Sequence, residues 1–316
     1  MTQNNITVYA PQESVLPSGT TDDQLIAMWL HDKAKQTQEE YTRDIQQFRE
    51  YVSVPLKLLT LPDLQAYADE LKLLDIKPAT IARRLKSIKS LLSFAQKTGY
   101  IRFNIGTMVK VPKLKKTLAE RIMSEEQVFT MLAKETNSRN HALLRLLYAS
   151  GIRVSELCDL CWKDVQSRGD TGQITVFGKG EKTRTILLKP ETYRELLTLH
   201  NDAPPDAPVF RSRGGARGKA GRHLDPSQVT RIVEAAAARA EIAIYTETVI
   251  KDGKPERRKR SRVSPHWLRH AHASHALDNG ASIAVVKETL GHESIETTAG
   301  YTHVRPGVSS AHYLKI

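Results

Sequence analysis

The sequence predicts a mainly α-helical protein of the α+β class, with two domains and one small antiparallel β-sheet. Apolar residues recur at helical spacing along most of the 316 residues. Two β-rich runs, 174–177 and 185–188, flank the glycine- and lysine-rich turn 178–184, which is the pattern of a hairpin. Residues 109–120 contain proline and lysine without an apolar period, so they are expected to link the two domains.

The N-terminal domain is expected at residues 21–108, after a flexible polar tail at residues 1–20. Four helices are predicted there, and the first two are expected to be separated near Thr37. The fourth, which begins at Pro78 and ends near Gly99, is strongly amphipathic. Its polar side carries four basic residues: Arg83, Arg84, Lys86 and Lys89. A basic helix face is commonly only solvated, but the charge of this chain favours contact with a DNA groove.

The C-terminal domain is expected at residues 121–316. A capping box of Ser124 and Gln127 opens its first helix, and further helices are predicted near 139–148, from Val154, at 191–200 and at 227–240. Residues 245–262 form a basic insertion. It begins with a β-like run, and we interpret the rest as a disordered loop that contacts phosphate.

Composition indicates the kind of partner. The formal net charge of +12 and the pI near 9.6, with basic residues gathered in particular segments, are typical of a protein that binds a polyanion. No apolar run approaches the length of a membrane span, and the polar N-terminus lacks a signal-peptide pattern. We therefore expect a soluble, cytoplasmic protein that binds nucleic acid.

Ionisable residues concentrate between Ser264 and His303. Pro265 suits a first helical turn and Gly280 and Gly291 are typical of helix ends, so the segment predicts helix, turn, helix, turn and short helix. It contains histidines, an arginine and a tyrosine: His266, Arg269, His270, His292, Tyr301 and His303. A fold core gains little from so many ionisable groups, because each buried polar atom needs a partner. A phosphate group is the expected partner.

Phosphodiester cleavage needs an in-line nucleophile, cations around the phosphate oxygens and a proton for the leaving alkoxide. The sequence has no Asp-x-Asp pair, no His-Glu-x-x-His and no Walker loop around Lys179. These features favour an enzyme without a metal or other cofactor, in which arginines hold the phosphate. A guanidinium group suits that role because it donates two parallel hydrogen bonds and stays charged.

A zinc site is the alternative. Two cysteines in a CxxC unit and four histidines supply enough ligand types: Cys158, Cys161, His266, His270, His272 and His275. Against this, the cysteines lie in an apolar helical pattern far along the chain from the histidines, whose spacings do not all share one helix face. We therefore interpret the cysteines as small hydrophobic residues, and His272 and His275 as structural.

Five short boxes resemble those of the tyrosine recombinases. They are 148–157 around Arg153, 178–180 around Lys179, 266–270, 290–292 and 300–303, in the family's order and at suitable spacing. The N-terminal half, with Pro78-Ala-Thr-Ile-Ala-Arg-Arg, is similar to the core-binding domain of the bacterial Xer-type branch, so the resemblance covers about residues 22–308. It implies a helical, SAM-like core-binding domain followed by a mixed helical catalytic domain with a small antiparallel sheet.

The resemblance also implies site-specific recombination of DNA, with six catalytic residues: Arg153, Lys179, His266, Arg269, His292 and Tyr301. Tyr301 would attack the scissile phosphate and form a 3′-phosphotyrosyl link. Arg153, Arg269 and His292 would bind the phosphate oxygens. Lys179 would protonate the leaving 5′-oxygen, and His266 would accept the tyrosine proton. Glu156 and His270 would support this set.

The implied partners are double-stranded DNA with an inverted-repeat core site and three further copies of the chain, in a tetramer on two duplexes. A second recombinase or an accessory protein remains open. The expected DNA contacts come from the basic segments: Arg83, Arg84, Lys86, Lys89, Lys113, Lys182, Arg184, Arg257, Arg258 and Arg260.

Two other functions fit much of this sequence. A type IB topoisomerase-like relaxase would use the same site without pairing two duplexes. A DNA-binding protein of the same fold would not cut, although all six implied catalytic residues are present, which argues against it. The chain departs from a minimal Xer-type protein in its basic insertion and in Gly300, which gives Tyr301 unusual backbone freedom.

Overall fold

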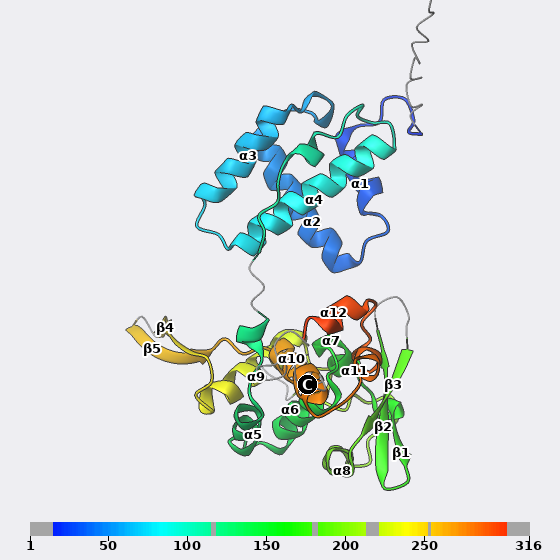
Figure 1. Cartoon of the computed structure of the whole chain (residues 1–316), viewed down its shortest axis with the longest axis vertical. Helices are drawn as coiled ribbons and strands as arrows, with labels where there is room; N and C mark the ends of the chain where they lie inside the picture. Colours follow the sequence, from blue (N-terminus) through cyan, green and yellow to red (C-terminus); the bar gives the residue numbers. More distant parts are fainter. Residues whose placement is uncertain (1–14, 115–117, 179–182, 213–220, 252–253, 302–316) are drawn as a thin grey trace, which may run out of the picture. The chain divides into compact units, whose positions relative to one another are not determined.

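The computed structural model describes residues 15–114, 118–178, 183–212, 221–251 and 254–301, and shows two compact units (Figure 1). The N-terminal unit comprises Met1–Lys115 and the C-terminal unit comprises Lys116–Ile316. Each unit has a hydrophobic core of its own. Helices predominate and the sheets are small and antiparallel, which confirms the predicted fold class.

The described part of the N-terminal unit contains four α-helices, α1 (Asp22–Leu30), α2 (Lys35–Val52), α3 (Leu61–Leu73) and α4 (Pro78–Lys97), and the short 3-10 helices Leu56–Leu58 and Ile105–Met108. The break between α1 and α2 lies before Lys35, earlier than the predicted break near Thr37. The side chain of Gln38 stabilises the turn between the two helices by donating hydrogen bonds to the carbonyls of Leu30 and Lys33.

Residues close to both described ends of the N-terminal unit pack on its core, which the sequence did not predict. Leu16 packs on the core and the Val15 amide donates to the carbonyl of Thr98, so residues 15–20 are anchored, while the rest of the expected tail lies outside the described residues. At the other end Val109 is buried and Val111 packs beside it. The first residues of the expected linker therefore belong to this core.

The C-terminal unit contains eight α-helices and two sheets in its described residues. The helices are α5 (Glu125–Ala133), α6 (Ser138–Ser150), α7 (Val154–Asp159), α8 (Pro190–Leu197), α9 (Pro226–Arg239), α10 (Pro265–Asp278), α11 (Ile283–Leu290) and α12 (Ile295–Ala299). Short 3-10 turns occur at Ala119–Arg121 and Trp162–Asp164. The predicted capping box of Ser124 and Gln127 is present. The order helix, turn, helix, turn, short helix predicted after Ser264 is confirmed by α10, α11 and α12.

The first sheet consists of β1 (Val165–Arg168), β2 (Thr171–Phe177) and β3 (Thr183–Leu188), in that spatial order and all antiparallel. Ile174 pairs with Ile186, and the predicted hairpin is confirmed. Alternate side chains of β2 and β3 enter the core, as period-2 patterning requires. Strand β1 was not predicted, because its residues are largely exposed and show no apolar alternation.

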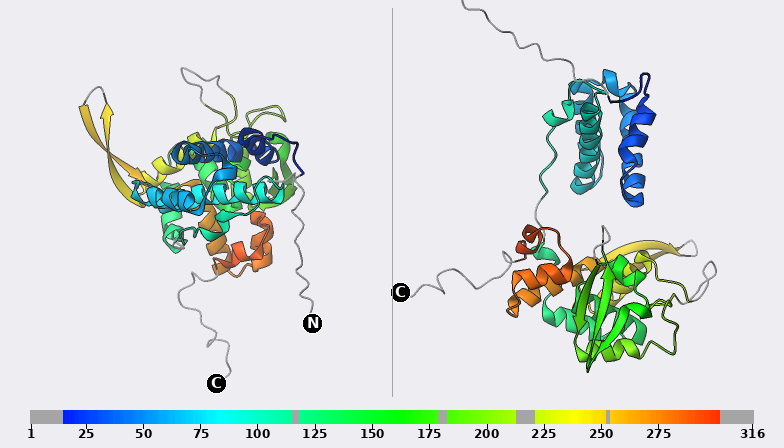
Figure 2. Two further views of the ribbon diagram at one scale, coloured as in Figure 1. Left: turned by 90° about the horizontal axis from the view of Figure 1, so that it is seen from above. Right: turned by 90° about the vertical axis from the view of Figure 1, so that its right-hand side faces the viewer.

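The basic insertion is a β-hairpin rather than the disordered loop that we expected. Strand β4 (Ile244–Lys251) pairs along its length with β5 (Lys254–Ser261), and residues 252–253 lie outside the described residues. Figure 2 shows this hairpin extending away from the rest of the C-terminal unit beyond α9. The prediction failed because β5 is almost wholly charged, and its strand conformation depends on pairing with β4.

Within the described ranges, no helix is long and apolar enough to cross a membrane.

Candidate active site

The candidate site is built where two helices of the C-terminal unit end. Helix α6 ends at Gly151 and α11 ends at Gly291, both in the left-handed conformation that favours glycine. A side chain at Gly151 would meet His272 and Leu290 at 2.7 Å, so the three segments α6, α10 and α11 pack too closely there for any other residue. This close packing brings their polar residues together.

Three arginines donate to backbone carbonyls at the end of α11, two of them to its last two residues and one to its C-cap residue, Gly291. Nε of Arg184 lies 2.7 Å from the carbonyl oxygen of Thr289, and Nη2 of Arg269 lies 2.7 Å from that of Leu290. Nη2 of Arg153 lies 3.1 Å from the carbonyl oxygen of Gly291. The last carbonyls of a helix have no intrahelical partner and carry the negative end of the helix dipole, so guanidinium groups are favoured there.

Glu156 connects two of these arginines. Its Oε1 accepts from Arg153 at 2.8 Å and from Arg184 at 2.9 Å, and its Oε2 accepts from Arg184 at 2.8 Å and from the Arg153 amide at 2.7 Å. Burial alone would raise the pKa of this carboxyl, but the hydrogen bonds from Arg184 and Arg153 outweigh it and hold the pKa at about 2. Glu156 is therefore ionised at neutral pH.

Arg269 is buried on α10, with 4% of its surface exposed. Its Nη1 donates to the carbonyl of Gly151 at 2.6 Å, on the opposite side from Leu290. Burial and the nearby charge of Arg153 lower its pKa to about 10, which leaves the group charged at neutral pH. Three guanidinium groups and one carboxylate thus lie together. Two further carboxylates, Glu288 and Glu293, are exposed and line a cleft together with Arg153 and Arg184.

Tyr301 is buried, and its hydroxyl lies 2.6 Å from Nδ1 of His270. The rings of His292 and Tyr301 are nearly parallel, with centroids 6.5 Å apart. Nδ1 of His292 lies 2.9 Å from the Thr298 hydroxyl, which orients that ring. The family resemblance implied that His266 would accept the proton of the tyrosine hydroxyl and would therefore lie against it. In this structure His270 makes it, and His266 stacks on His270 with a centroid distance of 6.1 Å.

The histidines of the site are neutral near pH 7. Burial and nearby arginines lower the pKa of His292 to about 4, and burial and His266 lower that of His270 to about 4. Partial desolvation, Arg269 and Arg153 also lower the pKa of His266. Burial raises the pKa of the Tyr301 hydroxyl, against the effect of Arg269. A neutral imidazole has a nitrogen lone pair that can accept a hydrogen bond from this hydroxyl, which is the geometric requirement for a general base.

A cleft of about 740 Å³ opens beside this cluster. Its lining comes from α7, β3, α11 and the turn before α12: Arg153, Ser155, Gly178, Thr183, Arg184, Glu288, Gly291, His292, Glu293, Ser294 and Thr297. Lys179 and Lys182 lie outside the described residues, so their predicted roles remain predictions. Arg184, expected to contact DNA, is largely enclosed, with 12% of its side chain exposed. Strand alternation was the missed signal, since it places Arg184 on the inner face with Ile186.

The basic residues of α4 divide into two kinds. Arg83 forms an ion pair with the buried carboxylate of Asp44, and Nζ of Lys89 donates to the carbonyl of Val109 at 2.7 Å. Arg84 is partly buried, with its Nε enclosed and without a hydrogen-bond partner. Lys86 is exposed. Of the four residues predicted to face DNA, Arg83 and Lys89 are thus engaged within the unit.

The arginines of the β4–β5 hairpin divide in the same way. Arg260 bonds to Glu234 of α9 at 2.6 Å and to Glu247 of β4 at 3.2 Å. Arg257 and Arg258 are exposed, and so is Lys113 near the end of the N-terminal unit. We conclude that Arg260 bonds the hairpin to α9, whereas the side chains of Arg257 and Arg258 face solvent.

The zinc alternative finds no support in the side-chain contacts. Cys158 is buried in α7 and burial raises its thiol pKa to about 12, as for a small hydrophobic residue. Nδ1 of His272 lies 2.8 Å from the Tyr148 carbonyl oxygen, and Nδ1 of His275 lies 2.9 Å from the Tyr148 hydroxyl. Within the described part of the chain, no three histidine, cysteine or acidic side chains gather as metal ligands would.

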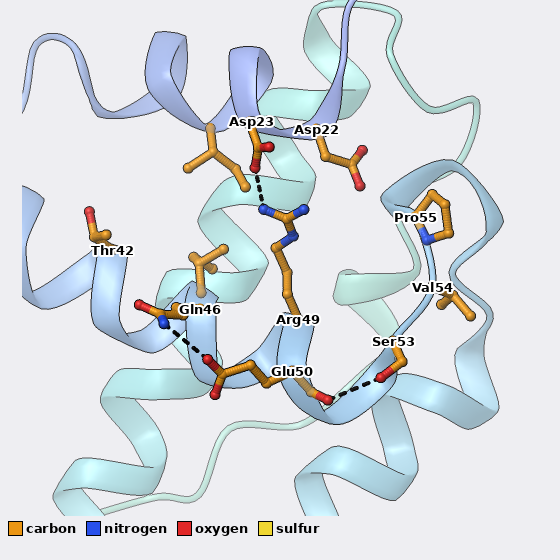
Figure 3. A pocket seen from close by; sticks show the side chains of 11 residues that line it. Asp22, Asp23, Thr42, Gln46, Arg49, Glu50, Ser53, Val54 and Pro55 are labelled. Carbon is orange, nitrogen blue, oxygen red and sulfur yellow. Dashed lines mark hydrogen bonds and ion pairs between the residues drawn. The ribbon is translucent and has the colours of Figure 1, made fainter.

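A second cleft, of about 680 Å³, lies in the N-terminal unit between α1 and the end of α2 (Figure 3). Figure 3 shows Asp23 paired with Arg49, and Gln46 with Glu50. Asp22 accepts hydrogen bonds from the hydroxyl of Tyr100 and from a backbone amide. The polar groups that line this second cleft thus largely bond to one another, and we interpret the cleft as part of the fold rather than as a binding site.

Comparison with known proteins agrees with this geometry. The model of the phage integrase family matches residues 114–307, and that of the phage integrase N-terminal SAM-like domain matches residues 25–99. The tyrosine recombinase XerC of Myxococcus xanthus is 33% identical over 290 residues, covering 85% of this chain and 87% of that protein. The XerC of Thermodesulfovibrio yellowstonii is 31% identical over 283 residues, covering 85% of each.

Solved structures share the fold. A lambda integrase dimer bound to a COC′ core site matches with a TM-score of 0.67 and 16% identity, over 92% of this chain and 80% of that one. The XerH recombinase bound to its difH substrate matches with a TM-score of 0.64 and 21% identity, over 89% and 81%. The chain belongs to the phage integrase family. It is a tyrosine recombinase similar to the Xer proteins, and hence a site-specific recombinase.

Proposed function

We propose that the chain cleaves and rejoins DNA strands by transesterification, with Tyr301 as the nucleophile. One observation carries the proposal. The Tyr301 hydroxyl meets a neutral histidine at 2.6 Å, in the same unit in which Arg153 and Arg269 converge with His292 at the end of α11. A nucleophile, a proton acceptor and phosphate-binding cations are the groups that phosphoryl transfer without a cofactor needs.

The first step forms a bond between the Tyr301 oxygen and the scissile phosphorus and breaks the bond from phosphorus to the 5′-oxygen. The products are a 3′-phosphotyrosyl link and a free 5′-hydroxyl. The tyrosine proton passes to the His266–His270 pair, of which His270 holds the hydroxyl in this structure. Lys179 is proposed to protonate the 5′-oxygen. Attack by a 5′-hydroxyl of the partner strand reverses the step, so the bond energy is conserved.

Arginines would stabilise the negative charge that develops on the non-bridging oxygens of the phosphate. Arg269 keeps its positive charge in a buried position, with the partly exposed Arg153 beside it, and a buried cation acts more strongly than one in water. His292, neutral and oriented by Thr298, would add one hydrogen bond to a non-bridging oxygen. This arrangement supports a metal-free reaction, because the arginines supply the positive charge.

Assembly and DNA contact belong to the same proposal. The sequence resemblance supports four protomers acting on two duplexes with an inverted-repeat core site, and the lambda integrase structure is a dimer on a core site. Described exposed basic residues are the proposed contacts with the DNA backbone: Lys86, Lys113, Arg257 and Arg258. Lys182 remains a predicted contact. A cytoplasmic location also remains a prediction.

The test is a suicide DNA substrate, nicked beside candidate sites from the protein's own locus, with EDTA present. We expect a covalent protein–DNA adduct on a denaturing gel with the wild type and none with Tyr301→Phe. A cut that appears only when a divalent metal replaces the EDTA, and that leaves no adduct, would overturn the proposal. A two-site assay then separates recombination from relaxation, and native mass measurement on the paired product counts the protomers.

A further inference from the structure

The third arginine at the end of α11 has no role in the proposed chemistry. Arg184 lies on β3, whereas the two proposed phosphate-binding arginines lie at the start of α7 and on α10, and 12% of the Arg184 side chain is exposed. Its guanidinium group makes three short contacts: two with Glu156, at 2.9 Å and 2.8 Å, and one with the carbonyl of Thr289, at 2.7 Å. With its donors directed inward in this way, it is poorly placed to bind DNA itself.

Its contacts lead to groups that act on the phosphate. Glu156, which Arg184 grips with both Nη atoms, also accepts from the side chain and the amide of Arg153. Thr289, the other partner of Arg184, lies two residues before Gly291 and three before His292. The carbonyl of Gly291 accepts a hydrogen bond from Arg153. Arg184 thus holds both the carboxylate and the helix end that fix the direction of the Arg153 guanidinium group.

The backbone at Gly291 is fitted to this arginine. Gly291 has a φ of +64°, and a Cβ there would lie 3.1 Å from Nη1 and 3.2 Å from Cδ of Arg184. The turn between α11 and His292 therefore packs directly on the Arg184 side chain. Strand β3 lies beside α11, as Figure 1 shows, so the sheet is joined to the helix end through this side chain.

We infer that Arg184 is a positioning residue, which locks Glu156 and the last turn of α11 and thereby sets the directions of Arg153 and His292. The inference rests on the proposed function for its effect on DNA cleavage, but its structural claim concerns the free protein. A bidentate guanidinium–carboxylate pair fixes both angle and distance, which a lysine ammonium cannot do. Displacement of a reacting group by about 1 Å can cost about 10²-fold in rate.

The first experiment measures the rate of adduct formation at saturating suicide substrate, together with DNA affinity. We expect Arg184→Gln to lower this rate about 10²-fold with little change in affinity, and Arg184→Lys to recover only a small part. Arg168→Gln is the matched control, because Arg168 is an exposed arginine on β1 of the same sheet. Adding Arg184→Gln to Glu156→Gln should slow the reaction by less than Arg184→Gln does in the wild type, since part of the effect of Arg184 passes through Glu156.

The second experiment needs no DNA. The ¹⁵N–¹H guanidinium signals of Arg153, assigned by comparison with Arg153→Gln, should shift and exchange faster in Arg184→Gln but not in Arg168→Gln. Unchanged Arg153 signals would overturn the inference. So would a loss of DNA affinity with an unchanged rate at saturation, which would make Arg184 a DNA contact. If the wild type forms no adduct, the proposed function fails, and the guanidinium signals alone decide the role of Arg184.

Discussion

Buried arginine–carboxylate contacts occur in both units, but their charge balance differs. In the N-terminal unit, Arg83 faces the buried carboxylate of Asp44, one cation against one anion. In the catalytic unit, Arg153 and Arg184 both bond to the carboxylate of Glu156, and Arg269, close enough to be influenced by its charge, bonds only to backbone carbonyls. Their remaining partners are backbone carbonyls, which carry only partial charges.

The comparison distinguishes an internal ion pair from a binding site. A one-to-one ion pair is electrically neutral and needs no anionic ligand, whereas a buried cation without a matching anion is costly unless an anion is bound. The catalytic cluster therefore has the electrostatic character of a phosphate site, and the α4 cluster has that of a fold contact. Arginine content alone does not separate the two.

The largest expected effect is on the catalytic side of this comparison. Arg269→Gln removes one fixed cation from the proposed site and should lower the rate of adduct formation by about 10²–10³-fold at saturating DNA. The rate is measured with the nicked suicide substrate. Arg83→Gln, assayed in parallel, should leave this rate unchanged at saturation. Equal losses in the two variants would show that the comparison is mistaken.

The substitution in the N-terminal unit, Arg83→Gln, should instead lower the stability of that unit. Arg83→Gln leaves the Asp44 carboxylate, only 1% exposed, without its cation, whereas Arg83 itself is 36% exposed. Solvent reduces the loss, so we expect destabilisation of about 1–3 kcal/mol rather than the full cost of breaking a fully buried pair. Urea unfolding of the full chain, followed by fluorescence of Trp29, measures it. Lys86→Gln on the same helix is the control and should change stability by less than about 0.5 kcal/mol.

Acid should affect the catalytic unit through its histidines. His270 and His292 have folded pKa values of about 4, below the ordinary 6.5, so the unfolded chain binds their protons first as the pH falls. Their contribution to stability is therefore present above about pH 6.5 and is lost as the pH falls towards 4. Urea midpoints of a Trp29→Phe chain at pH 7 and pH 5 test this. His270→Gln should reduce the difference, and a midpoint independent of pH would contradict the low pKa values.

The smallest expected effect separates exposed from engaged cations. Arg257→Gln should weaken DNA binding modestly and reduce the slope of log affinity against log salt by about 1. Arg260→Gln should instead loosen the β4–β5 hairpin from α9, because Arg260 bonds to Glu234 and Glu247. Amide hydrogen exchange in the hairpin reports that loosening. The same loss of salt slope in both variants would mean that Arg260 also contacts phosphate.

Much of the fold was predictable, because it depends on local patterns. Apolar periodicity located the helices, the Ser124 capping box and the Gly291 helix end appear as expected, and the β2–β3 hairpin followed from its turn. Strands β1 and β5 were missed, since their residues are polar and they become strands only by pairing with a neighbour. Such pairing is a tertiary property.

The sequence by itself determined the family, and it supplied the residues of the proposed chemistry, because both depend on residue types in order along the chain. Tertiary structure decided what each cation faces. Arg83, Arg184 and Arg260 were all predicted to contact DNA, and within the free protein each bonds to a carboxylate. It also decided that His270 rather than His266 meets Tyr301. A side chain's partner depends on distances between segments far apart in the chain, and only packing sets those distances.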